Sequence, residues 1–133
     1  AREMAFKILF QVDVGKNIWQ EALARALSET EGLSEPTRRF VENLVEGTLQ
    51  HQKAIDEYIS KFAREWSLER MANTDRNILR MALYELTFMK EIPPSVTVNE
   101  AVELAKRYGD AESGKFVNGI LGEMIRSSHT QAP

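Results

Sequence analysis

The stretch GDAESGKF, residues 109–116, is the part of this chain that comes closest to a ligand-binding motif. Gly109, Gly114 and Lys115 match the G-x-x-x-x-G-K of a P-loop, in which backbone amides and a lysine hold the phosphates of a nucleotide. The next residue of a P-loop is a serine or threonine that ligates magnesium, whereas this chain has Phe116. The match therefore lacks the residue that the metal requires.

The surroundings of the loop also argue against a nucleotide site. A P-loop follows a buried strand, but the preceding residues, NEAVELAKRY, have the apolar spacing of an amphipathic helix. The carboxylates of Asp110 and Glu112 would repel a triphosphate. We therefore interpret Gly109 as the cap of one helix and Ser113 as the cap of the next.

Phe116 allows two interpretations on sequence grounds, and both stay open. It lies at the edge of an apolar helix face, so it can be an ordinary core residue. It also follows Lys115 at the start of a helix, where free amides, a cation and a ring together suit a phosphate with a stacked base.

Composition restricts the class of protein. The 133 residues predict one domain, and the 43% hydrophobic fraction is that of an ordinary globular protein. The chain has no cysteine and two histidines, so a thiolate metal site, a disulfide framework and a histidine-rich metal cluster are excluded. No signal peptide or spanning apolar run is present, which predicts a cytoplasmic protein with no membrane partner. No nucleophile and base are suitably spaced, so we expect neither an enzyme nor a cofactor.

Helical periodicity extends over nearly the whole chain, which predicts an all-α fold of about seven helices with short loops. The apolar stripes lie within residues 2–14, 19–27, 40–49, 55–62, 78–89, 98–105 and 116–125. The fifth stripe is apolar on more than one side, so we expect that helix at the centre. The predicted caps are Gly15, Ser34 with Pro36 in the first turn, Asn73 or Thr74, and a T-x-x-E box of Thr97 and Glu100 after an extended Pro93–Pro94 break.

Four segments of the sequence are specific enough to compare with a known family: AREMAFKILFQ at the start, DRNILRMALYEL, IPPSVTVNEAVELAKRYG and SGKFVNGILG. They closely resemble the NusB family of bacterial transcription antitermination factors. The likeness follows the family order over nearly the whole chain and is weakest between residues 15 and 50.

The resemblance implies a fold of two perpendicular three-helix subdomains, which we place at residues 1–65 and 66–133. It implies an RNA-binding protein without catalytic activity, whose partner is the small-subunit ribosomal protein that doubles as NusE. The two would bind the single-stranded boxA element of nascent ribosomal RNA and help the RNA polymerase antitermination complex to read through terminators. The family's RNA contacts fall on Arg2, Phe10, Glu112, Ser113, Lys115 and Phe116.

Contacts with the protein partner map near Glu85 in the fifth helix. Arg76 and Arg80 line one side of that helix, and an RNA or partner role for them is weighed against salt bridges with Asp75 and Glu85.

The remaining candidates have structural explanations. Lys106 and Arg107 suit the negative end of a helix dipole, and Arg38 and Arg39 suit a solvated face. Trp66 is expected to fill the junction between the subdomains.

Family members usually carry several arginines ahead of the A-R-E stretch, and this sequence begins at Ala1. We expect such residues to precede Ala1, the alternative being weaker phosphate contact. Two other functions stay open: a helical accessory module of a ribosomal RNA methyltransferase, and a purely protein-binding helical scaffold.

Overall fold

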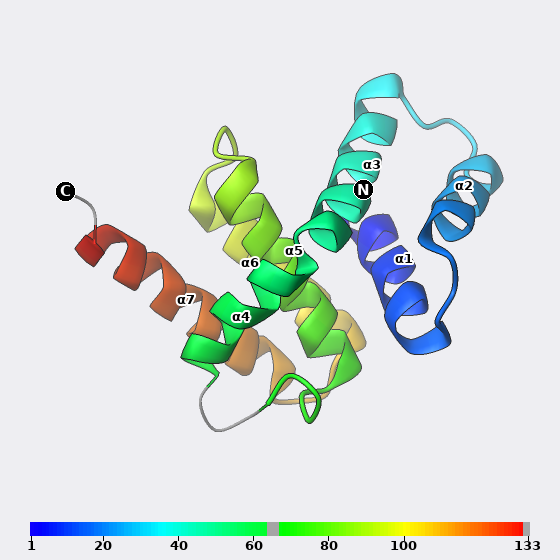
Figure 1. Ribbon diagram of the computed structural model, residues 1–133. Coiled ribbons are helices and arrows are strands. Elements are labelled where there is room, and N and C mark those ends of the chain that lie inside the picture. Colours follow the sequence, from blue (N-terminus) through cyan, green and yellow to red (C-terminus); the bar gives the residue numbers. More distant parts are fainter. Residues whose placement is uncertain (64–66, 132–133) are drawn as a thin grey trace.

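The computed structural model describes residues 1–63 and 67–131, which form seven α-helices and contain no strand (Figure 1). The helices are α1 (Arg2–Gly15), α2 (Trp19–Glu29), α3 (Glu35–Gln50), α4 (Gln52–Phe62), α5 (Asn73–Phe88), α6 (Pro94–Tyr108) and α7 (Ser113–Gln131). The predicted all-α class and helix number are confirmed. None of the described helices is both long and apolar enough to cross a membrane.

Helix α5 lies at the centre, as its sequence predicts. It contacts α1 and α3 on one side, α6 and α7 on the other, and α4 as well (Figure 1). Because neighbours surround it, residues on all its sides are buried, including Ile78, Leu79 and Met81. A helix that is apolar on several sides is stable only in such a position.

Helices α3 and α5 approach each other closely where Gly47 meets Tyr84. A Cβ atom on Gly47 would lie 2.1 Å from the tyrosine ring, so no larger residue fits without a shift. The Tyr84 hydroxyl donates a hydrogen bond of 2.5 Å to the side-chain oxygen of Asn43. The contact fixes α3 on the central helix, which α1 also contacts directly.

Two of the predicted caps are confirmed, Ser34 before α3 and Gly109 at the end of α6, and three are wrong. Ser34 caps α3, because its hydroxyl accepts a hydrogen bond of 3.3 Å from the Thr37 amide. Gly15 is instead the last residue of α1, and Lys16 takes the left-handed conformation with φ 56°. Helix α5 begins at Asn73 after Ala72, and no side chain caps it.

The predicted T-x-x-E capping box is also wrong, because α6 begins three residues earlier, at Pro94. Proline is favoured in the first turn, where its ring presets φ and its missing amide costs nothing. Thr97 consequently lies inside the helix, where its side chain is buried.

The division at residues 65 and 66 stays a prediction. Helix α4 packs against α3 on one side and against α5 and α7 on the other, so it contacts both halves of the molecule. The boundary itself and Trp66 lie within residues 64–66, outside the part of the chain that the structure describes.

Candidate nucleic-acid interface

The loop between α6 and α7 is held together by Asp110 and Ser113. The Asp110 amide donates to the Ser113 hydroxyl oxygen at 3.0 Å, and that hydroxyl donates to the Asp110 carboxylate at 3.2 Å. The Glu112 amide also donates to this carboxylate, at 2.9 Å. The Asp110 carboxylate therefore accepts a hydrogen bond from an amide that would bind phosphate in a P-loop. In addition, helix α6 precedes the loop, whereas a strand precedes a P-loop.

Gly109 is required for packing rather than for an approach to phosphate. A Cβ atom there would lie 2.3 Å from the Ser113 hydroxyl oxygen and 2.8 Å from the Ala105 carbonyl oxygen. The absence of a side chain lets the loop close tightly onto the start of α7.

A buried carboxylate, that of Asp75, lies close to Ser113 of this loop. Asp75, in the first turn of α5, is buried, and its Oδ1 has no hydrogen-bond partner. Burial raises the pKa of the Asp75 carboxyl; the Ser113 hydroxyl opposes this shift and the charge of Asp110 adds to it. Ser113, predicted to contact RNA, is only 1% exposed and is engaged within the loop, so its RNA contact stays a prediction.

The other predicted residues of the loop face outward. Lys115 and Glu112 are exposed, and Phe116 is half-buried against the core. A ring at the edge of the core is compatible with both interpretations of Phe116, as a packing residue and as a stacking surface.

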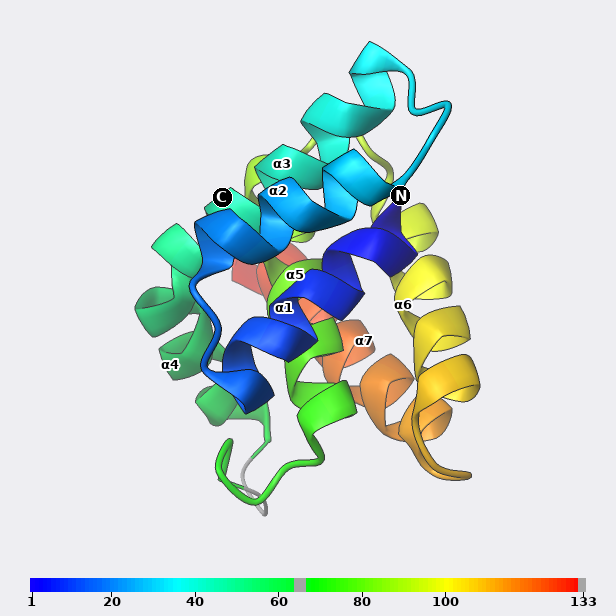
Figure 2. The same cartoon turned by 90° about the vertical axis from the view of Figure 1, so that its right-hand side faces the viewer.

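Side chains of α1 and of the end of α6 form a polar and aromatic face near this loop, and Figure 2 shows α1 beside α6. Oε2 of Glu3 accepts hydrogen bonds from the Arg107 guanidinium at 2.6 Å and from the Tyr108 hydroxyl at 2.7 Å. Both bonds lower the pKa of the Glu3 carboxyl, and the bond from Tyr108 has the larger effect. The Lys7 ammonium lies 5.6 Å from the Tyr108 ring centroid.

An aromatic row joins the same face to Phe10. The ring of Phe6 lies 5.3 Å from that of Tyr108 and 6.1 Å from that of Phe10. Phe10, predicted to contact RNA, is half-buried and is thereby connected to the residue that precedes the loop. The sequence analysis missed this face, since Arg107 was explained by the helix dipole and Tyr108 was not singled out.

Arg2 lies away from the loop, near the start of α6. Its guanidinium donates two hydrogen bonds of 2.9 Å to the carboxylate of Glu85, whose side chain is 1% exposed. The Thr97 hydroxyl donates to the same carboxylate, and the Phe40 ring lies 5.2 Å from the guanidinium carbon. A predicted RNA contact and a predicted partner contact are thus bound to each other.

Arg76 and Arg80 also have internal partners. Arg76 donates to Asp13 at 2.7 and 3.0 Å, and Arg80 donates to Asp56 at 2.8 and 2.9 Å. Of the two alternatives, internal salt bridges are present, but their carboxylates come from α1 and α4 rather than from Asp75 and Glu85 of the same helix.

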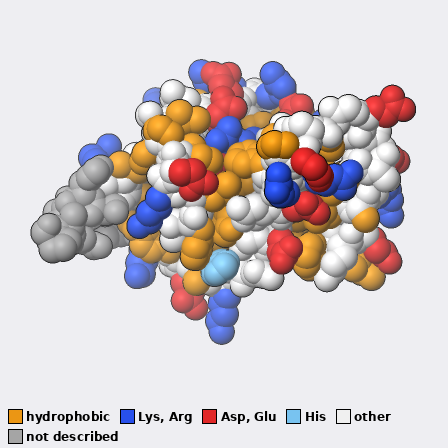
Figure 3. Space-filling model, turned by 90° about the horizontal axis from the view of Figure 1, so that it is seen from above, with side chains coloured by type: hydrophobic (Ala, Val, Ile, Leu, Met, Phe, Trp, Pro, Cys, Tyr) orange, Lys and Arg blue, Asp and Glu red, His pale blue; other side chains and the backbone are white. Residues whose placement is uncertain are grey.

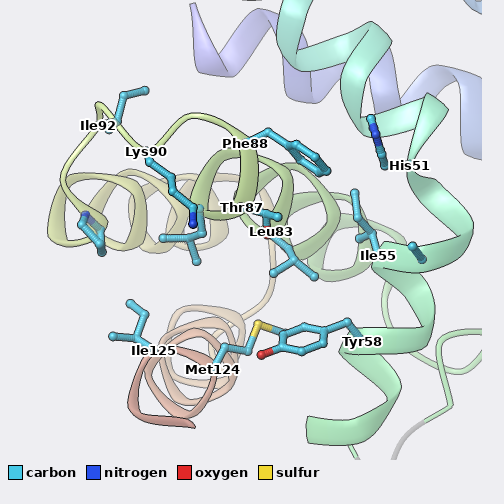
Figure 4. A pocket seen from close by; sticks show the side chains of 13 residues that line it. His51, Ile55, Tyr58, Leu83, Thr87, Phe88, Lys90, Ile92, Met124 and Ile125 are labelled. Atoms are coloured by element: carbon cyan, nitrogen blue, oxygen red, sulfur yellow. The ribbon is translucent and has the colours of Figure 1, made fainter. Parts of the chain in front are cut away.

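A separate apolar groove lies between α4, the end of α5 and α7. It has a volume of about 590 Å³, and hydrophobic side chains gather beside a histidine on the face seen in Figure 3. The rings of His51 and Phe88 lie 4.3 Å apart at its edge, and Phe88 is 50% exposed (Figure 4). None of the predicted RNA or partner residues lines it.

Among the described residues, no group of three or more histidines, cysteines or carboxylates could hold a metal ion. Glu112, Lys115 and Phe116 lie together in the loop and at the start of α7, and the aromatic row connects Phe10 to Tyr108, the last residue of α6. It places Arg2, Glu85, Arg76 and Arg80 in internal ion pairs.

Comparison with known proteins agrees with this fold. Residues 1–126 match the model of the NusB family. The chain is 51% identical over its full length to a transcription antitermination protein NusB of Pelotomaculum thermopropionicum, covering 92% of that protein. It is 49% identical to the protein of the same name of Bacillus subtilis, with 93% of this chain and 91% of that protein covered.

Solved structures give the same result. The NusB of T. maritima superposes with a TM-score of 0.88 at 40% identity, covering 94% of this chain and 87% of that one. A chain of the crystal structure of antitermination factors NusB and NusE in complex with double-stranded RNA superposes with a TM-score of 0.86 at 29% identity, covering 95% and 93%. Sequence and structure together show that this chain belongs to the NusB family.

Proposed function

We propose that this protein is an RNA-binding transcription antitermination factor. It binds boxA-type elements of nascent ribosomal RNA together with the small-subunit ribosomal protein that acts as NusE, and it helps RNA polymerase to read through terminators. Family membership and the similarity to a chain of a NusB–NusE–RNA complex support the proposal. The protein acts in the cytoplasm and is not an enzyme.

The observation that carries the proposal is the loop with its neighbouring aromatic row. Lys115 is exposed next to a half-buried Phe116, and before the loop the half-buried rings of Phe10 and Tyr108 flank the buried ring of Phe6. The partly exposed rings are therefore those of Phe10, Tyr108 and Phe116. Unpaired bases of a single strand stack on such rings, and a nearby cation neutralises phosphate. A duplex keeps its bases stacked internally, so this arrangement favours a single-stranded element.

The contacts with the ribosomal protein are harder to place. Glu85, Arg76 and Arg80 are engaged inside the molecule, so a partner that used them would first have to break buried ion pairs. Their partner role stays a prediction. We expect the ribosomal protein to strengthen RNA binding, because a chain of formal charge −3 offers RNA few cations of its own.

Fluorescence anisotropy with a boxA-like RNA and a shuffled RNA of equal length tests the proposal, with and without the ribosomal protein. We expect preference for the boxA-like RNA, tighter binding with the partner, and a log–log salt slope of about −2 to −4, as for ~3–5 neutralised phosphates. Equal binding of both RNAs in both conditions would leave the protein-binding scaffold as the better description. Calorimetry should detect association of the two proteins without RNA.

A further inference from the structure

We propose that Arg107 and Tyr108, with Lys7 beside them, form a phosphate subsite for the RNA backbone, and that Glu3 occupies this subsite when RNA is absent. The inference rests on the proposed function and extends the RNA interface from the α6–α7 loop onto the junction of α1 and α6. In this arrangement the Glu3 carboxylate stands where an anionic phosphate oxygen would be.

The geometry around Glu3 is that of an anion site. A single oxygen, Oε2, accepts both the Arg107 bond of 2.6 Å and the Tyr108 bond of 2.7 Å. A phosphate oxygen can accept the same two bonds, and guanidinium groups bind phosphate and carboxylate in equivalent ways. The Lys7 ammonium adds positive charge that favours any anion at this point.

Exposure makes an exchange of anions feasible. The side chains of Arg107 and Glu3 are 67% and 37% exposed, so neither must be moved out of the core. Exposed ion pairs stabilise a protein little, because water and salt screen both charges. RNA phosphate can therefore displace Glu3 without the large penalty that opening the buried Arg2–Glu85 pair would carry.

The position of the subsite fits a continuous strand. Tyr108 directly precedes Gly109 of the loop, and its ring is linked through Phe6 to Phe10. In the order of these contacts, the subsite lies between Phe10 on α1 and the loop that leads to Lys115 on α7. Bases stacked at either end would leave their connecting phosphates near Arg107.

The test measures boxA-like RNA affinity and its salt dependence for four variants of the full chain. Arg107→Gln should weaken binding about 5- to 10-fold and make the salt slope shallower by about 0.7, the contribution of one phosphate on a single strand. Tyr108→Phe keeps the ring and loses only the hydroxyl, so we expect a loss of about 2- to 3-fold with little change in slope. Glu3→Gln should strengthen binding about 3-fold, because the internal competitor is removed.

Arg126→Gln is the matched control. Arg126 is an exposed arginine that also bonds a carboxylate, Glu123 at 2.9 Å, but on a distant turn of α7. We expect its affinity to change less than about 2-fold, because exposed charges more than a Debye length away are screened. Thermal melts of each variant check that folding is retained.

The experiment distinguishes a failure of the proposed function from a failure of the phosphate subsite. If the parent chain binds boxA-like and shuffled RNA equally, the proposed function fails and this inference fails with it. If the parent discriminates but Arg107→Gln loses no more affinity than Arg126→Gln, the subsite alone is overturned. Weaker binding by Glu3→Gln would also overturn it, since Glu3 would then contact RNA rather than compete with it.

Discussion

Helix α1 carries charged residues on two sides, and the structure uses them in opposite ways. Toward α5, Arg2 and Asp13 form ion pairs with Glu85 and Arg76 that are largely shielded from water. Toward α6, Glu3 forms an ion pair with Arg107 that stays open to solvent. The same residue types therefore form an interface that holds α1 on α5 and an exposed face that can bind a charged ligand.

Desolvation explains the difference. Once a charge is buried, removing its partner leaves it without water or counter-charge, so a buried pair must stay closed. An exposed pair is nearly as well solvated apart as together, and an external phosphate can replace one member. A charged residue assigned to RNA by its sequence position must therefore be judged by its burial.

The largest expected effect is on the buried side. Glu85→Ala leaves the Arg2 guanidinium and the Thr97 hydroxyl without their shared acceptor, so we expect a loss of about 3 kcal/mol in the free energy of unfolding. Urea unfolding measures it. Glu100→Ala is the control, because Glu100 faces the same guanidinium at 3.8 Å but is exposed; its loss should be below about 0.5 kcal/mol. Equal losses would mean that burial does not separate the two kinds of pair.

The ion pairs of α1 also show where sequence reasoning ends. Helix positions and the central place of α5 follow from local apolar spacing, and they were predictable. The Arg2–Glu85 bond joins residues 83 positions apart, and such a contact exists only once α1 has docked. Nearby charges of the same helix were therefore considered as partners of Arg76, whereas its actual partner Asp13 comes from another helix.

The loop was predictable in part. That its glycine spacing is not a P-loop followed from the helix before it, which the structure contains. The inward position of Ser113 was not predictable, because it depends on Asp75 from α5 and on the close contact with Gly109. Equally, the Glu3–Arg107 pair joins residues 104 positions apart, so neither residue had a local signal of function beyond helix-end preference.

The next largest effect is expected on RNA binding, from an aromatic ring at the start of α7 rather than from a charge. If Phe116 stacks on a base, Phe116→Ala should weaken RNA binding roughly 5- to 150-fold, corresponding to about 1–3 kcal/mol. Phe88→Ala is the aromatic control, because Phe88 is exposed at the groove and not at the loop; its RNA affinity should not change. Thermal melts accompany the binding assay. Intact affinity with a sharply lowered melting temperature would assign Phe116 to the core instead.

A smaller effect is expected from Asp75, the buried carboxylate in the first turn of α5. Because the pKa of Asp75 is raised on folding, the folded chain binds more protons than the unfolded chain above the usual Asp pKa of about 3.9. Its contribution to the free energy of unfolding therefore falls as the pH rises through the folded pKa. Asp75→Asn removes this dependence, so the variant should gain stability relative to the parent between about pH 4 and about pH 7. Urea unfolding at both values measures it, and a relative loss at the higher pH would contradict the shift.

The smallest effect is expected from neutralising one exposed carboxylate of the loop. Glu112 directly precedes Ser113, whose contact with Asp110 is partly buried, yet its own side chain is exposed, three residues before Lys115. A carboxylate there repels incoming phosphate only through water, which amounts to a few tenths of a kcal/mol at most. Glu112→Gln should thus raise RNA affinity about 2-fold in about 50 mM salt and leave it unchanged in about 500 mM salt, because the Debye length shortens. Glu57→Gln, an exposed carboxylate on α4, removes the same charge at a distance and corrects for the change in net charge. If both variants raise affinity equally, the gain reflects total charge alone, and the loop holds no special place beside the RNA backbone.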